Sequence, residues 1–203
     1  MHGYIGHTDY GWWRYLSARP GIHEVNFWRP GGRRFAALSP GEPFFFRLNS
    51  PINRIGGVGL FARYASLPVW RAWEVFGPAN GVDDERALLE RLGRLARRQV
   101  GPGDLVGCVA VSECVLFEAD EWVNVPATFR PQNLSGAVID LRIGDGHRLW
   151  GECLERAAAV PRFEWVAEAS DRLRRGQPQM VMPRLGQGSF RLRCSMPTPA
   201  PVR

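Results

Sequence analysis

Flat aromatic side chains and hydrogen-bonding groups share one short stretch near the N-terminus, GYIGHTDYGWWRYL, which spans residues 3–16. A protein that holds an extruded nucleobase needs aromatic rings against the faces of the base and hydrogen-bonding groups against its edge. Each stack of a base on an aromatic ring contributes roughly 1–3 kcal/mol. The residue types therefore predict a nucleobase pocket. Two structural alternatives stay open, because such rings usually fill a core and Asp9 could simply cap a helix.

A second stretch, EVNFWRP at residues 24–30, has the alternation of a strand. Val25 and Phe27 alternate with Asn26 and Trp28, so one pair should face the core and the other a different environment. Asn26 and Trp28 add an edge contact and a stacking ring to the first stretch. The candidate base-binding residues are Tyr4, Thr8, Asp9, Trp12, Trp13, Asn26 and Trp28.

The charge of the chain favours an anionic partner but does not identify one. The formal net charge is +6 and the isoelectric point is about 9.8, values that suit a nucleic-acid-binding protein. The chain contains no lysine, however, so all 26 basic residues are arginine. Together with the many Ala, Gly and Pro residues, this also fits a coding bias. The charge therefore permits DNA binding without establishing it.

Enzyme signatures are missing from the sequence. It contains no GxSxG, Walker loop, HExxH or dinucleotide fingerprint, and no recognisable pair of acid and base carboxylates. The cysteines Cys108, Cys114, Cys153 and Cys194 form no CxxC pair, and the histidines do not complete a zinc site. We therefore expect Cys108 and Cys114 to be buried thiols, and we expect no metal site and no catalysis by this chain alone.

The elements that must position these residues begin with a mostly β region over residues 1–65. Runs rich in aromatic and β-branched residues alternate there with turns rich in Pro and Gly. Glycines at 56, 57 and 59 lie inside the IGGVGLF run, where they mark bulges and a strongly bent sheet. The expected strands are 24–30, 44–48, 54–65, two short strands between 104 and 123, and 137–144.

The expected helices surround this sheet. Capping and termination signals predict a short helix from Asp9 to Pro20, and an apolar stripe predicts a longer helix over 83–99. Further helices are expected within 66–82 and over 147–159. No apolar run is long enough to span a bilayer, and the N-terminus does not have the pattern of a signal peptide. We therefore expect a cytoplasmic protein without a membrane partner.

Five segments in order carry a resemblance to a known family. They are YIGHTDYGWWRYL, HEVNFWRPGGRRFAALSPGEPFFFRL, IGGVGLFARYASLPVWRAWEVFGPANG, GCVAVSECVLFEADEWVNVP and PRLGQGSFRL. Over about residues 3–193 the chain resembles the N-terminal region of bacterial HNH-type restriction endonucleases. The order of the parts also resembles PUA-like readers of modified bases, such as the EVE and YTH domains.

This resemblance implies a DNA-recognition module whose catalytic HNH module is missing. No histidine follows His147, whereas an HNH site needs a histidine base and metal ligands, so a divalent metal would belong to the missing module. One departure lies inside the recognition module. Residues 136–140 read GAVID, where the family pattern has a GKxYD-like segment that carries a lysine and a tyrosine.

Together these observations predict an α+β fold, a PUA-like, strongly bent β-barrel with peripheral helices. We expect a recognition domain over 1–160, a helix and connector over 161–193, and a disordered Pro-rich tail over 194–203. The expected function is recognition of DNA by flipping a modified base into the aromatic pocket, without a cofactor. The expected phosphate-binding residues are Arg14, Arg29, Arg33 and Arg34. The alternatives are a reader of modified bases in RNA, an active nuclease with an unrecognised metal site, and a non-catalytic remnant or protein-interaction domain.

Overall fold

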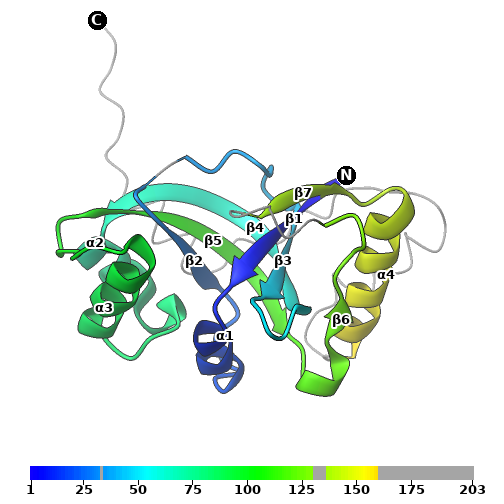
Figure 1. The fold of residues 1–203 in the computed structure, drawn as a ribbon, viewed down its shortest axis with the longest axis horizontal. Coiled ribbons are helices and arrows are strands. Elements are labelled where there is room, and N and C mark those ends of the chain that lie inside the picture. The colour runs from blue at the N-terminus through cyan, green and yellow to red at the C-terminus, as the bar shows by residue number, and fades with distance from the viewer. Residues whose placement is uncertain (33, 130–135, 160–203) are drawn as a thin grey trace, which may run out of the picture.

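A computed structural model describes residues 1–32, 34–129 and 136–159, which form one seven-stranded sheet with helices around it. Figure 1 shows α2 and α3 gathered at one end of the molecule and α4 at the other, with α1 between them. The elements are β1 His2–Thr8, α1 Tyr10–Ser17, β2 Val25–Pro30, β3 Pro43–Leu48, β4 Arg54–Pro68, α2 Val69–Phe76, the 3-10 helix η1 Gly77–Asn80, α3 Glu85–Ala96, β5 Leu105–Leu116, the 3-10 helix η2 Ala119–Glu121, β6 Val123–Asn124, β7 Ala137–Asp140 and α4 Gly144–Ala158.

The sheet has the strand order β2-β5-β4-β3-β1-β7, and β6 pairs with β4. Its pairs are antiparallel except for β1 and β3, which run parallel. The pairing of β4 with β5 shifts register between Val58 and Leu60. A Cβ on Gly59 would lie 2.6 Å from Val111 Cγ1, so glycine allows the close approach at this bulge. The strong bend expected from the strand glycines is therefore confirmed.

The predicted barrel is not closed. The strands β2 and β7 end the sheet, and no backbone ladder joins them within the described residues. The ring centroids of Phe27 on β2 and Phe44 on β3 lie 4.8 Å apart, so aromatic side chains pack between these two strands, which are not neighbours in the sheet. The α+β class and the bent sheet are confirmed, and the closure of the barrel was wrong.

Both faces of the sheet are covered, which explains the three consecutive phenylalanines of β3. Phe44 and Phe46 belong to the buried group that includes the residues of α1, α2 and α3, whereas Phe45 belongs to a second group with α4. Its ring meets Trp150 of α4 edge to face at 6.1 Å. All three phenylalanines are fully buried. A strand covered on both faces reads as a continuous apolar run.

The local signals placed the helices well. Asp9 caps α1 and Asp84 caps α3 through hydrogen bonds to Trp12 N and Ala87 N. The helix expected within 66–82 splits into α2 and η1, and α4 begins at Gly144, ahead of the expected start. The region 104–123 holds one long strand, not two short ones, because β5 pairs with β4 on both sides of Glu113. Glu113 has a positive φ of 52° at the expected break.

The expected helix and connector over 161–193 and the expected tail over 194–203 lie outside the described residues. Among the helices that the structure describes, none has the length and apolar character needed to cross a membrane.

Candidate functional site

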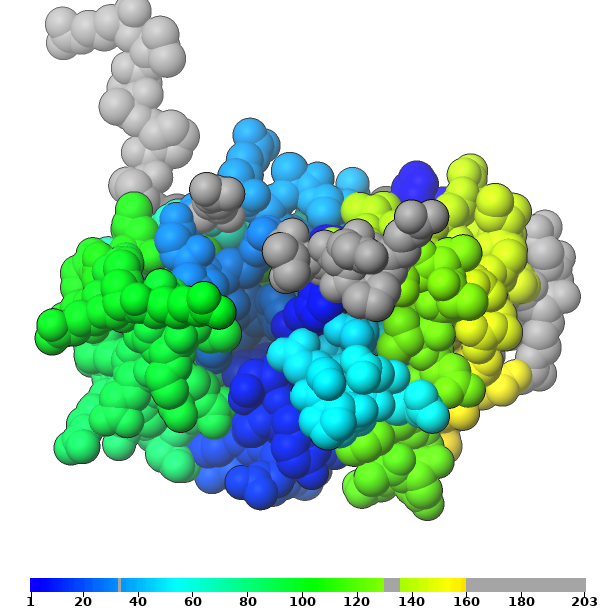
Figure 2. Space-filling view, viewed as in Figure 1, coloured from blue at the N-terminus to red at the C-terminus, as the bar shows by residue number. Residues whose placement is uncertain are grey.

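The surface is hollowed between α3 and the turn that joins β3 to β4, as Figure 2 shows. The strands β1 and β2 and the helix α1 lie at the base of this hollow. The strand β1 ends at Thr8 and α1 begins at Tyr10, because Asp9 keeps an extended backbone while its side chain accepts from Trp12 N and caps the helix. The stretch singled out in the sequence therefore forms the base of the hollow.

A layer of aromatic rings lies between β1 and β2, and Phe27 is its partly exposed member. The Phe27 ring centroid lies 4.8 Å from that of Phe44 and 6.1 Å from that of Trp12, and both partners are buried. Gly6 of β1 faces the same layer, since a Cβ there would lie 3.3 Å from Phe27 Cζ. The glycine leaves room for the rings, and Phe27 is the ring of this group that stays partly exposed.

Tyr4 extends this layer and is itself buried. Its ring meets Phe35 edge to face at 4.9 Å and lies 5.4 Å from Phe44. Burial raises the pKa of the Tyr4 hydroxyl. Trp12 is also buried, between Phe27 and Phe46. Tyr4 and Trp12, two of the predicted stacking residues, are therefore buried in the aromatic layer and support the ring of Phe27.

Thr8 and Asp9, the predicted base-edge contacts, lie where β1 ends and α1 begins. Thr8 is buried and its hydroxyl donates to Gly6 O at 3.2 Å. Asp9 is exposed, and its Oδ1 accepts a hydrogen bond from Trp12 N at 2.9 Å. The same oxygen lies 3.4 Å from Arg91 Nη1 of α3. Asp9 therefore both caps α1 and pairs with an arginine that the sequence did not single out.

Trp13 points away from Phe27 toward the start of β4. Its Nε1 donates to Gly56 O at 2.7 Å, and its ring meets Trp122 edge to face at 5.3 Å. Tyr10 stacks on Trp13 with ring centroids 5.7 Å apart and is 42% exposed. The accessible stacking surface on this side of α1 therefore belongs to Tyr10, which its exposed position at the start of the helix could have signalled.

Asn26 and Trp28 lie on the opposite face of β2 from Phe27, as the alternation predicted. Asn26 Nδ2 donates to Asn80 Oδ1 at 2.9 Å, and Trp28 Nε1 donates to Asn80 O at 2.9 Å. Both side chains are buried against η1. The structure therefore does not bring Asn26 and Trp28 together with Thr8 and Asp9.

The candidate phosphate-binding arginines are spread over two regions. Arg14 is exposed on α1, and Arg29 and Arg34 lie at and beyond the end of β2. The Arg29 guanidinium carbon lies 5.7 Å from the ring centroid of Phe35. Arg33 lies outside the described residues. No single cluster of these arginines forms among the residues that the structure places.

A buried arginine near the hollow was missed by the sequence reasoning. Arg47 of β3 is only 9% exposed. Its Nη1 donates to His7 Nδ1 at 2.8 Å, and its Nη2 donates to Asn53 Oδ1 at 2.7 Å. Burial lowers the pKa of the guanidinium. A charged residue inside the apolar run FFFRL was the available signal.

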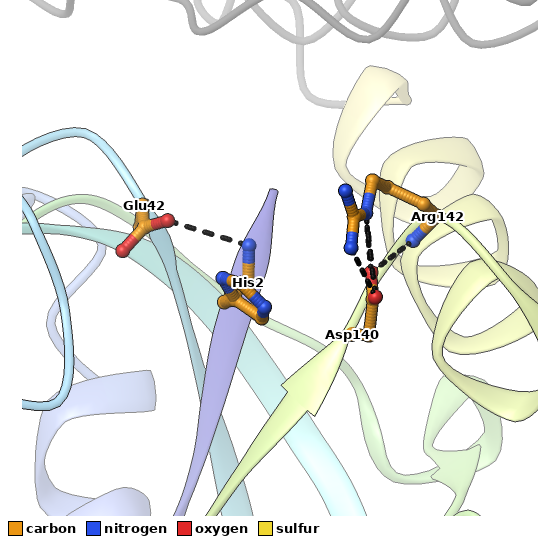
Figure 3. Close-up of polar contacts among 4 residues, drawn as sticks. All are labelled: His2, Glu42, Asp140 and Arg142. Atoms are coloured by element: carbon orange, nitrogen blue, oxygen red, sulfur yellow. Dashed lines mark hydrogen bonds and ion pairs between the residues drawn. The ribbon is translucent and has the colours of Figure 1, made fainter.

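A second polar group lies at the opposite end of β1, where β7 pairs with it (Figure 3). His2 N donates to Glu42 Oε1 at 3.3 Å. The shortest hydrogen bonds from Arg142 to Asp140 run from Nη2 to Oδ2 at 2.6 Å and from Nε to Oδ1 at 2.9 Å, and Arg142 N also donates to Oδ1 at 3.0 Å. Arg142 holds the pKa of Asp140 well below its usual range. Asp140 closes the GAVID segment, whose residues 137–140 form an edge strand beside β1.

Two further expectations concern cysteines and metals. Cys108, Cys114 and Cys153 are buried free thiols, which confirms the expectation for the first two. Burial raises the pKa of the Cys108 thiol to about 12. Cys194 lies outside the described residues. Within the described part of the chain, no group of three or more His, Cys, Asp and Glu side chains could hold a metal ion.

No family model matches this chain, and no curated protein matches it. Among solved structures, the chain is similar to ASCH from Zymomonas mobilis, with a TM-score of 0.49 and 10% identity over 72% of this chain and 92% of that one. Two point mutants of that protein give TM-scores of 0.49 and 0.47 at 11% and 12% identity. Because these likenesses are weak, we base the function on the side chains of this chain. The resemblance to HNH endonucleases stays a prediction.

Proposed function

We propose that this chain binds nucleic acid and holds one unstacked base in the hollow, against the ring of Phe27. The observation that carries this proposal is the partly exposed Phe27 ring, backed by the buried rings of Trp12 and Phe44. A flat apolar surface that rests on rigid rings is preorganised for stacking, and one stack contributes roughly 1–3 kcal/mol. Tyr4 completes the support behind it.

Polar groups at the end of β1 would read the edge of the base. The exposed Asp9 carboxylate and the Arg91 guanidinium lie 3.4 Å apart where α1 approaches α3. One supplies acceptors and the other supplies donors. Thr8 sets the backbone at the end of the strand through its bond to Gly6 O. Tyr10, stacked on Trp13, would take the neighbouring base.

The finer proposal is recognition of a modified base in DNA, as the module of an HNH-type restriction endonuclease. The sequence resemblance supports it, and the net charge of +6 suits a polyanionic partner. The modified bases to test first are 5-methylcytosine, 5-hydroxymethylcytosine and N6-methyladenine. Arg14, Arg29 and Arg34 would contact phosphates, and Asn26 and Trp28 would hold β2, and with it Phe27, against η1.

The test is a titration of the full chain against fluorescent duplexes that are matched except for one modified base, with single-stranded DNA and RNA of the same sequence in parallel. Phe27→Leu keeps an apolar side chain but removes the flat ring, and should weaken binding by about tenfold through the lost stack. Trp70→Leu is the matched control, because Trp70 is an exposed aromatic residue of α2. It should bind as the native chain does.

Three outcomes would change the proposal. Equal binding to modified and unmodified duplexes, suppressed by salt, would reduce the chain to a nonspecific basic domain. Tighter binding to RNA than to DNA, with the same dependence on Phe27, would favour the RNA reader. Equal effects of Phe27→Leu and Trp70→Leu in folded protein would place the base outside the hollow.

A further inference from the structure

Arg47 is a buried cation that forms no ion pair with the residues that the structure describes. It is 9% exposed, and no carboxylate of the described residues lies within ion-pair distance of its guanidinium. A buried charge that lacks a partner of opposite sign is unfavourable, so proteins rarely keep one without compensation. The neutral side chains around Arg47 supply hydrogen bonds but no negative charge.

One edge and one face of the guanidinium are held in place. Nη1 donates to His7 Nδ1 at 2.8 Å, and since a guanidinium can only donate, the imidazole proton must sit on Nε2. The Phe129 ring covers the group, with its centroid 5.1 Å from Arg47 Cζ. These contacts fix the orientation of the guanidinium plane at the ends of β1 and β3.

The other edge carries an incomplete fork of donors. The N–H groups of Nε and Nη2 lie in the guanidinium plane and point toward the same side. Together they can donate to two oxygens of one oxyanion. Nη2 donates to Asn53 Oδ1 at 2.7 Å, whereas Nε is buried and has no hydrogen-bond partner. Asn53 itself is exposed, in the turn between β3 and β4. A neutral amide oxygen thus occupies one half of a site shaped for two anionic oxygens.

We propose that Arg47 binds a backbone phosphate of the nucleic acid, with Nε and Nη2 donating to two of its oxygens after Asn53 Oδ1 has moved aside. This inference rests on the proposed function, since it names the phosphate next to the base in the hollow. His7 and Thr8 are successive residues of β1, and Asn49 N donates to Thr8 O at 3.1 Å. The turn that carries Asn53 is therefore tied to the strand end that faces the hollow.

The exchange is favourable for a physical reason. Hydrogen bonds from a guanidinium to an ionised oxygen are shorter and stronger than those to a neutral amide oxygen. The phosphate would also satisfy Nε, which makes no hydrogen bond without it. The displaced Asn53 side chain is exposed, so water can satisfy its amide.

Arg47 could instead serve only to stabilise the turn between β3 and β4. The variant Asn53→Gly distinguishes this structural role from phosphate binding. Glycine suits the positive φ of 50° at this position and removes the competing oxygen. If Arg47 binds phosphate, Asn53→Gly should strengthen the binding of inorganic phosphate. If Arg47 serves only to fasten the turn, the variant should lose thermal stability and gain no affinity.

The decisive experiment uses the full chain and a single-stranded oligonucleotide in which one linkage at a time is a neutral methylphosphonate. At one linkage next to the bound base, neutralisation should weaken binding to the native chain by about tenfold. Arg47→Gln should bind the unmodified oligonucleotide about tenfold more weakly than the native chain does. The same methylphosphonate should not weaken the binding of this variant any further. Arg86→Gln, an exposed arginine of α3 paired with Glu90, should keep the native pattern.

A second arm measures the melting temperature with inorganic phosphate and no nucleic acid. Phosphate should raise the melting temperature of the native chain, more so for Asn53→Gly and not for Arg47→Lys, which keeps the charge but loses the fork. These two variants keep the test valid if Arg47→Gln fails to fold.

The outcomes separate the two proposals. Oligonucleotide binding that depends on Phe27 while no linkage couples to Arg47 would overturn this inference and leave the proposed function standing. Stabilisation by phosphate that depends on Arg47, with no oligonucleotide bound, would overturn the proposed function and the backbone-phosphate assignment. Neither effect in folded protein would overturn both.

Discussion

Asn26 Nδ2 donates a hydrogen bond of 2.9 Å to Asn80 Oδ1, and both side chains are completely buried. Asn80 Nδ2 in turn donates to Ala72 O and Gly77 O, and Asn80 O accepts from Trp28 Nε1. This pair therefore fastens the edge strand β2 to α2 and η1. Because Phe27 lies between Asn26 and Trp28 on the same strand, the pair also positions the partly exposed Phe27 ring.

We expect Asn80→Ala to lower the free energy of unfolding by about 3 kcal/mol, because it leaves a buried donor of Asn26 without its acceptor and removes the hydrogen bonds that Asn80 Nδ2 donates to Ala72 O and Gly77 O. Urea denaturation followed by circular dichroism measures this loss. Asn26→Ala and the double variant complete a thermodynamic cycle, in which the double loss should be smaller than the sum of the single losses. Strictly additive losses would show that the two amides do not stabilise each other.

Gly81 allows Trp12 to take its place behind the ring layer. Its φ of +77° suits glycine, and a Cβ would overlap Trp12 Cδ1. Gly81→Ala should therefore destabilise the protein more than Gly31→Ala. Gly31 also has a positive φ, of +83°, but a Cβ there meets nothing within 4 Å, so its substitution carries only the backbone strain of about 1–2 kcal/mol. Thermal melts would compare the two variants, and equal losses would show that Trp12 can move without cost.

Local sequence signals were sufficient for the parts of the fold that depend on neighbours in the chain. Asp9 and Asp84 cap helices because a carboxylate accepts from a backbone amide three residues ahead. The run FFFRL was correctly read as a buried strand. Closure of the barrel was predicted wrongly, because it depends on whether the edge strands β2 and β7, which lie far apart in the sequence, meet in a backbone ladder.

The contacts of the candidate site residues could be predicted only in part, for the same reason. The alternation in β2 separated Phe27 from Asn26 and Trp28, but nothing in the sequence shows that Asn80, which lies 54 residues further along, accepts a hydrogen bond from Asn26. Arg47 was missed because its partner His7 lies 40 residues away. The pattern of residue types predicts on which face of a strand a side chain lies. Its contacts on that face depend on segments far away in the sequence, so they are known only from the folded structure.

Asp140 should make stability depend on pH. Arg142 lowers the pKa of this carboxyl, so the ionised form stabilises the folded chain above the unfolded pKa of about 3.9, and this contribution is lost as the pH falls through the folded pKa. Asp140→Asn should therefore melt below the native chain at pH 7. The difference should narrow as the pH falls below about 4.

Melting temperatures measured from neutral to acid pH would check this, with Asp120→Asn as the control. Asp120 is an exposed residue of η2 and forms no ion pair with other described residues. Its variant should differ little from the native chain across the range. A gap between Asp140→Asn and the native chain that stayed constant with pH would mean that Asp140 acts through its shape and not through its charge.

Asp9 offers the sharpest separation between a structural and a recognition role. Its Oδ1 caps α1 by accepting from Trp12 N at 2.9 Å. Asp9→Ser keeps a capping oxygen and removes the carboxylate, whereas Asp9→Ala removes both and should cost about 1 kcal/mol of stability. If the carboxylate reads the edge of the base, both variants should lose the preference for the modified duplex. Thermal melts and fluorescence anisotropy would measure the two effects side by side.

The control is the same pair of substitutions at Asp84, which caps α3 by accepting from Ala87 N at 2.7 Å. Asp84→Ala should lose about 1 kcal/mol of stability, because Asp84, like Asp9, accepts from the backbone N–H three residues ahead. Neither Asp84 variant should change the preference for the modified base. If Asp9→Ser retained full discrimination, the carboxylate would be only a helix cap, and Arg91 with the backbone near Thr8 would have to read the base edge instead.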